Sequence, residues 1–177
     1  MSIRITGGEF RGRQISSPLT SKTRPTGAMA REALFNILQD VSEFNVLDLF
    51  AGSGAVGIEA LSRGAEQVTA VEKNRAQAQS LLNSYKSLGV EEKLHLCVAE
   101  VQDFFSRAIT REERFDLIYA DPPFTEAYPD LQPFLKLLSP RGVAVFEIPS
   151  RKAPEWTQAG RIRRYGESSL AFFSATL

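Results

Sequence analysis

The sequence is short of the side chains that build disulfides and metal clusters. Its 177 residues include one cysteine, Cys97, and one histidine, His95, two positions apart in a strand-like run. A single cysteine excludes an internal disulfide and any metal centre that needs several cysteines. One histidine and one cysteine this close together make a poor ligand set, and both residues fit a strand. We therefore expect a protein that binds no metal.

Long apolar runs are also missing. No run approaches the ~20 apolar residues that a membrane span needs. The first residues, MSIRITGGEFRGR, lack the apolar stretch of a secretory signal. The length fits one domain with a sizeable core. These features predict a cytoplasmic protein with no membrane partner.

There is no excess of either charge, because Lys plus Arg and Asp plus Glu each number 21. The distribution is uneven, however. Residues 1–36 hold six basic residues against two acidic ones, which leaves +4 there and −4 on the remainder. Such asymmetry is typical of a basic arm on a slightly acidic body. We predict a basic hairpin arm over residues 1–26 and a single globular domain over residues 27–177.

Strand-like and helical patterns alternate after residue 45. Before it, strand-like pieces at 3–6 and 13–15 indicate a hairpin, and apolar residues at 30, 34, 37 and 38 mark one face of a helix. Strands are expected at 45–49, 67–71, 94–98, 115–120 and 142–148, with helices at 55–63, 75–88, 101–108 and 131–138. Such alternation forms right-handed crossovers and a parallel sheet.

The end of the chain breaks this alternation. The last two strands, 161–165 and 170–176, are separated by four residues, which allows a hairpin but no crossover. The predicted fold is therefore α/β and Rossmann-like. It has a mostly parallel seven-stranded sheet, one antiparallel strand near the C-terminus and a short N-terminal β-hairpin.

The first strand of this alternating pattern leads into a glycine-rich turn. Gly52, Gly54 and Gly57 form a GxGxxG fingerprint between a strand and a helix, the context that a nucleotide-binding loop requires. Glycines allow the tight turn and let a ligand approach the backbone. Glu72 ends the second strand, where a carboxylate can accept hydrogen bonds from both hydroxyls of a ribose. The competing interpretation, a tight turn without a ligand, gives Glu72 no role.

Three features favour S-adenosylmethionine over a dinucleotide as the ligand. Asp48 precedes the glycines, where a carboxylate can meet the cationic methionine end of the cofactor. After the third strand, Val101 can pack on an adenine ring and Glu100 can accept from its amine, although Glu100 also fits a solvated helix start. The third feature is the motif that follows strand four. The predicted cofactor-binding residues are Asp48, Phe50, Ala51, Gly52, Ser53, Gly54, Glu72, Lys73, Glu100, Val101 and Asp121.

That motif is Asp121-Pro122-Pro123-Phe124. Ligands of open α/β sheets bind beyond the carboxyl ends of the strands, so Asp121 should face the cofactor. The amine of a nucleic-acid base is a poor nucleophile, because its lone pair is delocalised into the ring. The Asp121 carboxylate and the Pro122 carbonyl can accept its hydrogens and localise that pair, while Phe124 can stack on a flipped-out base. A plain Asp-Pro turn is the alternative. We predict these four residues as catalytic, in a class I methyltransferase fold.

Together these residues resemble a known family, the bacterial 16S ribosomal RNA guanine-N2 methyltransferases of the RsmD type. The resemblance runs from RITGG (4–8) and FRGR (10–13), through TRPT (23–26), REALFNIL (31–38) and the glycine turn, to DPPF (121–124) and YG (165–166). It implies methylation of a guanine 2-amino group in 16S ribosomal RNA, within a partly or fully assembled small subunit, with S-adenosylhomocysteine as the other product. The chain departs from the family at residues 27–30, where GAMA replaces a stretch that usually carries Asp-Arg, and in the short segment after DPPF.

The N-terminal arm is the predicted RNA contact, because a phosphate backbone attracts basic side chains. The predicted RNA-binding residues are Arg4, Arg11, Arg13, Arg24 and Arg31. A solvated surface strand pair is the competing interpretation of the arm, and Arg24 or Arg31 could instead brace the cofactor loop through the helix that follows. Three other functions stay open: an N-methyltransferase for DNA adenine, one for a protein glutamine amide, and a catalytically silent RNA-binding assembly protein.

Overall fold

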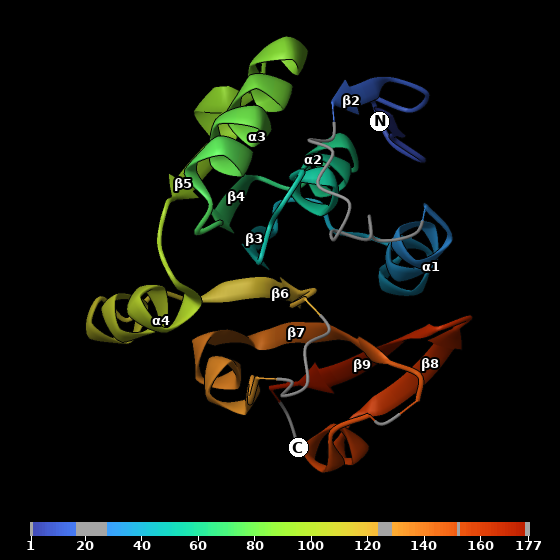
Figure 1. Ribbon diagram of the computed structural model, residues 1–177, viewed down its shortest axis with the longest axis vertical. Coiled ribbons are helices and arrows are strands. Elements are labelled where there is room, and N and C mark those ends of the chain that lie inside the picture. The colour runs from blue at the N-terminus through green and yellow to red at the C-terminus, as the bar shows by residue number, and fades with distance from the viewer. Residues whose placement is uncertain (1, 17–27, 124–128, 152, 176–177) are drawn as a thin grey trace.

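The computed structural model describes residues 2–16, 28–123, 129–151 and 153–175. Its centre is a seven-stranded sheet with the strand order β5-β4-β3-β6-β7-β9-β8 (Figure 1). The strands are β3 (Asn45–Leu49), β4 (Gln67–Val71), β5 (Leu94–Cys97), β6 (Phe115–Ala120), β7 (Leu138–Pro149), β8 (Arg161–Tyr165) and β9 (Ser168–Ser174). The pairs from β5 to β7 are parallel, whereas β9 is antiparallel to both β7 and β8. The predicted fold is confirmed.

Helices cover both faces of the sheet. They are α1 (Ala28–Leu38), α2 (Ala55–Ser62), α3 (Arg75–Leu88) and α4 (Val101–Thr110), with the 3-10 helices η1 (Glu91–Lys93), η2 (Gln132–Leu137) and η3 (Glu155–Ala159). The buried side chains form two core clusters. The first contains residues of α1, α2 and α3 with Val46 of β3, and the second contains residues of α4 and η2 with Leu47 of β3. Successive strand residues point to opposite faces of the sheet. Because Val46 and Leu47 are both fully buried, each face is covered at this strand. None of the helices in the described ranges has the length and apolar character to span a bilayer.

The N-terminal hairpin is present but is built into the body of the protein. Its strands are β1 (Ser2–Arg4) and β2 (Gln14–Ser16), paired antiparallel. Its apolar side chains belong to the first core cluster; they are Ile3, Ile5, Phe10 and Ile15. The Phe10 N–H donates to Ser62 Oγ of α2 at 2.8 Å. The hairpin therefore carries its basic side chains on a fixed base rather than on a free arm.

The largest difference from the expected elements lies between β6 and β7. The helix predicted over residues 131–138 is present, but it is the 3-10 helix η2, and β7 already begins at Leu138. Leu131, Phe134 and Leu137 are all fully buried, and their spacing of three matches the period of a 3-10 helix. Pro133, near the start of η2, has no N–H to donate within a helix.

A smaller difference concerns the final hairpin. The turn between β8 and β9 has two residues, Gly166 and Glu167, instead of the expected four. Gly166 has a φ of 65°, which suits the first position of a tight hairpin turn.

Candidate active site

Three parallel strand ends meet at the centre of the sheet. Leu49, the last residue of β3, pairs with Val71 of β4 and with Ala120 of β6. Beyond these residues the chain continues into the glycine turn, Glu72 and Asp121, so the predicted parts of the site lie along one edge of the sheet. The strand order changes direction at β3, which is where open α/β sheets bind ligands.

The glycine turn uses left-handed backbone conformations. Gly52 and Gly54 have φ values of 54° and 74°, and Phe50 has a φ of 61°, which strains an aromatic residue. A Cβ on Gly54 would lie 2.7 Å from Leu81 Cγ of α3, whereas among the described atoms a Cβ on Gly52 would meet only the Phe50 carbonyl oxygen, at 3.8 Å. Gly54 therefore allows α2 to pack on α3, and the turn at Gly52 leaves room for a ligand.

Glu72 is 7% exposed and ties this turn to the next helix. Its Oε2 accepts from the Gly52 N–H at 2.9 Å, and its Oε1 accepts from the Asn74 N–H at 2.7 Å. Asn74 in turn caps α3, because its side chain accepts from the N–H groups of Ala76 and Gln77. Each Glu72 oxygen has further acceptor capacity, so the predicted contact with ribose hydroxyls is compatible with these bonds.

Asp48 is 2% exposed, and its Oδ2 has no hydrogen-bond partner among the described residues. Burial raises the pKa of Asp48 from 3.8 to about 7, opposed by a backbone hydrogen bond from Gly57 and aided by the charge of Glu72. The Tyr85 hydroxyl of α3 is likewise buried without a partner among those residues. Burial, and then the charge of Asp48, raise the pKa of Tyr85. A buried carboxylate with an unsatisfied oxygen fits the cationic end of a ligand.

The predicted adenine side of the site is more open. Lys73 Nζ lies 3.3 Å from Glu100 Oε1, and the two side chains are 64% and 60% exposed. Glu100 precedes α4 without capping it through its side chain, and Val101 belongs to the second core cluster. Such an exposed ion pair contributes little to stability, so a ligand can rearrange it at low cost. Contact of Lys73, Glu100 and Val101 with adenine stays a prediction.

The chain beyond β6 contains the predicted catalytic motif. Asp121 is partly exposed, Pro122 is buried and Pro123 is exposed. Phe124 lies outside the described residues. The structure brings the first three residues of the motif to the edge that holds the glycine turn, and their catalytic roles stay predictions. Within the described ranges, no group of three or more His, Cys, Asp or Glu side chains is arranged to hold a metal ion.

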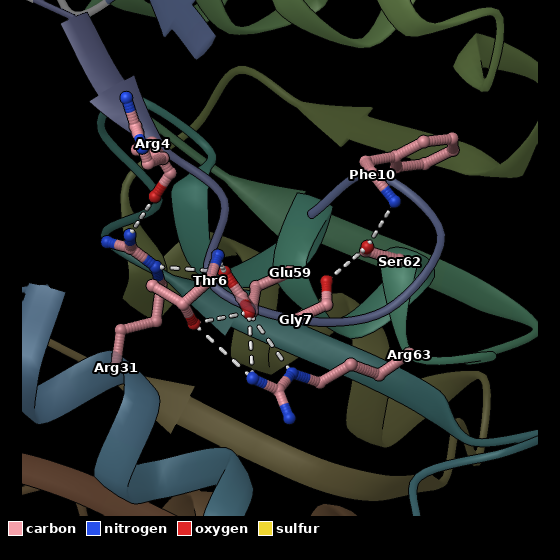
Figure 2. Close-up of polar contacts among 8 residues, drawn as sticks. All are labelled: Arg4, Thr6, Gly7, Phe10, Arg31, Glu59, Ser62 and Arg63. Atoms are coloured by element: carbon pink, nitrogen blue, oxygen red, sulfur yellow. Dashed lines mark hydrogen bonds and ion pairs between the residues drawn. The ribbon is translucent and has the colours of Figure 1, made fainter. Parts of the chain in front are cut away.

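A buried carboxylate that the sequence interpretation missed lies on α2, the helix that follows the glycine turn. Glu59 is fully buried and receives donors from three segments of the chain (Figure 2). Thr6 donates its N–H at 2.9 Å and its hydroxyl at 2.6 Å, while Nε of Arg31 and Nε of Arg63 lie at 3.3 and 3.1 Å. Burial acts to raise the pKa of Glu59, but the hydrogen bonds from Thr6 and Arg63 and the charge of Arg31 hold it below its usual value. The feature of the sequence that could have indicated this buried carboxylate is the single charged residue within the helix AVGIEALS.

Of the five arginines predicted to bind RNA, Arg31 has a different role. It is 1% exposed and bound to the buried carboxylate of α2, and its Nη2 donates to the backbone oxygen of Arg4 at 2.7 Å (Figure 2). The prediction of an RNA contact for Arg31 is therefore corrected to the bracing role, which joins α1 and the hairpin to the helix of the glycine turn. Arg4, Arg11 and Arg13 are exposed, and Arg24 lies outside the described residues.

Comparison with known proteins places this geometry in a family. A family model described as Conserved hypothetical protein 95 matches residues 3–174. The chain is 36% identical over 141 residues to ribosomal RNA small subunit methyltransferase D of Escherichia coli K12, which covers 79% of this chain and 68% of that protein. The protein of the same name from Haemophilus influenzae is 34% identical over 123 residues, covering 69% of this chain and 64% of the relative.

Solved structures agree with this match. A hypothetical protein of Thermus thermophilus has a TM-score of 0.82 and 29% identity, covering 97% of this chain and 99% of that one. The T. thermophilus 16S rRNA N2 methyltransferase RsmC, in complex with AdoMet and guanosine, has a TM-score of 0.73 and 26% identity, covering 98% of this chain and 49% of that one. The fold and the site define the class of S-adenosylmethionine-dependent methyltransferases. Within that class, the chain belongs to the family of ribosomal RNA small subunit methyltransferase D.

Proposed function

We propose that this protein transfers a methyl group from S-adenosylmethionine to the N2 amine of a guanine in 16S ribosomal RNA, within a partly or fully assembled small subunit. The observation that carries the proposal is the position of Asp121 and Pro122. They follow β6 directly beside the glycine turn, because Leu49 of β3 pairs with Ala120 of β6. Two hydrogen-bond acceptors next to a methyl-donor site suit a planar amine whose lone pair must be localised.

The cofactor supplies a methyl group on a positively charged sulfur. The Asp121 carboxylate and the Pro122 carbonyl accept the two hydrogens of the guanine amine and direct its lone pair toward that methyl group. As the new N–C bond forms and the S–C bond breaks, the nitrogen becomes positively charged, and Asp121 takes its extra proton. Pro122 and Pro123 hold the turn rigid, so the acceptors need little reorganisation. The products are N2-methylguanine and S-adenosylhomocysteine.

The residues around the glycine turn suit the three parts of this cofactor. Glu72 accepts from the ribose hydroxyls, using acceptor capacity beyond its bonds to Gly52 and Asn74. Asp48 receives the cationic methionine end, which satisfies the buried Oδ2 atom. Val101 and the exposed Lys73–Glu100 pair border the adenine.

The substrate class rests on the relatives and on the hairpin. The E. coli relative is named for the small-subunit ribosomal RNA, and the T. thermophilus structure is named as an N2 methyltransferase and contains guanosine. Exposed arginines on the hairpin suit a phosphate backbone. DNA adenine and a protein glutamine amide also present planar amines, and they are the substrates against which the proposal is tested.

The test supplies the protein with labelled S-adenosylmethionine and each of four substrates: small subunits lacking base modifications, deproteinised 16S ribosomal RNA, duplex DNA, and cell protein freed of nucleic acid. Digestion and mass spectrometry then identify the labelled product. N2-methylguanosine from the subunits or the ribosomal RNA supports the proposal. Label found only in methyladenine or only in protein would contradict it, and comparison of the first two substrates shows which assembly state is used.

A further inference from the structure

Basic residues are concentrated at both ends of the chain. Residues 149–177 hold five basic residues against two acidic ones, whereas residues 37–148 hold ten basic against seventeen acidic. The N-terminal excess has already been described, and the C-terminal one is centred on β8, whose sequence is RIRRY. Arg161, Arg163 and Arg164 are all exposed. An acidic middle therefore separates two basic ends in the sequence.

Strand β8 is the last strand of the sheet and points toward the edge that carries the candidate active site. It is antiparallel to β9, and β9 is antiparallel to β7, so β8 runs in the same direction as β7 and β6. The carboxyl end of β8, at Tyr165, thus lies along the same edge as the chain beyond Ala120 (Figure 1). Arg163 and Arg164 lie within two residues of that end.

The alternation of the strand divides its three arginines between two faces. Arg161 and Arg163 share a face with Tyr165, which packs against the first core cluster. Their partners across the ladder, Phe172 and Leu170, belong to or pack against that same cluster. This is the face covered by the hairpin and α1.

The reverse face of β8 carries the third arginine. Arg164 shares that face with Ile162, which packs against the second core cluster. The strand therefore presents two arginines to the side of the hairpin and one to the opposite side.

A continuous path of contacts joins the two basic segments on the first face. The hairpin is bound to α1 through the bond from Arg31 to the Arg4 backbone oxygen. Helix α1 contacts β9, and β9 pairs with β8. Figure 1 shows α1 between the hairpin and the pair β8–β9. The two basic chain ends, far apart in sequence, thus flank one helix on one side of the molecule.

We propose that Arg161 and Arg163 form the second half of an RNA-docking surface whose first half is the hairpin with Arg4, Arg11 and Arg13. The inference rests on the proposed function and names the surface by which that same site holds its substrate. In the part of the chain that the structure describes, neither Arg161 nor Arg163 forms an ion pair. Their charges are therefore available to phosphate groups, and each phosphate contact releases counterions from the RNA. Charged side chains on an edge strand also discourage pairing with another sheet. Because that role does not involve RNA, it predicts no change in the salt dependence of RNA binding when the arginines are replaced.

The test is the salt dependence of RNA binding by the double variant Arg161→Gln with Arg163→Gln. Affinity for deproteinised 16S ribosomal RNA is measured at several KCl concentrations, with S-adenosylhomocysteine present. Loss of two phosphate contacts should reduce the slope of log affinity against log salt by about 1.5. Affinity for S-adenosylhomocysteine should equal that of the wild type. Thermal unfolding of the variant checks that the edge strand is intact.

Two matched controls remove arginines elsewhere. Arg111 and Arg114 line a pocket with Asn45 and Gln67, at the starts of β3 and β4, so Arg111→Gln with Arg114→Gln removes the same charge from the opposite edge. Arg164→Gln, compared with Arg163→Gln alone, tests the reverse face of β8. Wild-type slopes in both controls, with a reduced slope in the double variant, support the proposal.

Three results would overturn it. The first is an unchanged slope in the Arg161 and Arg163 double variant. The second is a slope reduced as much in the Arg111 and Arg114 control as in that double variant. The third is a slope reduced as much in Arg164→Gln as in Arg163→Gln. Each can be obtained while the wild type still produces N2-methylguanosine, in which case the proposed function stands and only the docking surface fails. A wild type that methylates no RNA contradicts the proposed function instead.

Discussion

At the scale of single residues, three carboxylates along one edge of the sheet differ in what surrounds them. Glu72 accepts two backbone N–H groups, Asp48 has a buried oxygen without a partner among the described residues, and Asp121 is partly exposed. A carboxylate held by backbone donors can position a ligand, and one with a buried oxygen that lacks a donor attracts a cation. A more exposed one can meet a substrate. The three should therefore respond differently to substitution.

For Glu72→Ala, we expect cofactor affinity to fall by about 1.5–3 kcal/mol, because charged hydrogen bonds to the ribose are lost. The side chain also holds the Gly52 and Asn74 N–H groups, so part of the loss comes through the turn itself. Isothermal titration with S-adenosylhomocysteine measures the change. Glu72→Gln, which keeps the size of the side chain and one acceptor oxygen, should lose less. Unchanged affinity in Glu72→Ala would remove the ribose contact from the site.

For Asp121→Ala, we expect methyl transfer to be abolished while cofactor binding changes little. The lost interaction is with the target amine and is strongest near the transition state, so turnover suffers far more than binding. Single-turnover assays with labelled cofactor, together with calorimetry, separate the two quantities. Wild-type turnover in this variant would mean that another group accepts from the amine.

Asp48 should make stability depend on pH. Its pKa in the folded protein is raised from 3.8 to about 7, so the folded state favours the protonated carboxyl. Between these values the folded protein binds more protons at this site than the unfolded chain, and the free energy of unfolding therefore falls as pH rises from 4 to 7. The fall from this residue is on the order of 4 kcal/mol.

Urea unfolding at several pH values, in wild type and in Asp48→Asn, isolates this contribution. The asparagine variant cannot ionise, so its stability should fall less over the same range. Parallel profiles for the two proteins would show that Asp48 titrates normally. A cationic ligand stabilises the ionised form, so cofactor affinity should rise with pH through 7 in the wild type and lose that dependence in the variant.

At the scale of elements, α2 links the glycine turn to the hairpin and α1 through Glu59. Thr6 and Arg31 both donate to this one carboxylate. Arg63, the residue that follows α2, stacks over the Phe35 ring of α1 with its guanidinium carbon 5.1 Å from the ring centre. A buried ion pair is a weak source of net stability, but breaking one leaves an uncompensated buried charge. The three elements should therefore lose stability together when Glu59 is replaced.

We expect Glu59→Gln to lower the free energy of unfolding by about 3–5 kcal/mol, because Arg31 stays buried without its counter-charge. Urea unfolding near neutral pH measures the loss. Because the folded pKa of Glu59 lies below its usual 4.5, the stabilising contribution is complete above that pH and is lost as pH falls through the folded pKa.

Glu66→Gln is the control for this change, since Glu66 is exposed just beyond α2. It should alter stability by no more than about 0.5 kcal/mol. Equal stability of Glu59→Gln and Glu66→Gln would exclude a structural role for the buried cluster.

At the scale of the whole molecule, the hairpin presents its arginines from a fixed base. Replacement of Arg4, Arg11 and Arg13 by glutamine should reduce the slope of log affinity against log salt for 16S ribosomal RNA by about two to three, one phosphate contact per arginine. Cofactor affinity should be unchanged, because Asp48, Gly52 and Glu72 lie at the strand ends. An unchanged slope would assign these arginines a purely structural role.

The sequence alone determined the features that depend on near neighbours. Alternation of strands and helices predicts the parallel sheet, and the glycine spacing with Glu72 predicts the ligand-binding turn, because each pattern is set within one or two elements. The four-residue gap likewise predicts an antiparallel final hairpin. The helix expected over residues 131–138 is present at Gln132–Leu137, but its 3-10 type could not be predicted, because apolar spacing alone does not separate an α-helix from a 3-10 helix containing a proline.

Tertiary structure decided what depends on distant partners. Arg31 reads as a surface arginine in sequence, but its partner Glu59 is 28 residues away, and Thr6 reaches the same carboxylate across 53 residues. The sequence alone suggests that the hairpin is a free arm, whereas in the structure its apolar side chains belong to the core. Only the fold brings the basic N-terminal and C-terminal segments to one side of the sheet. The physical reason is that burial and charge pairing depend on contacts between segments that are far apart in the sequence.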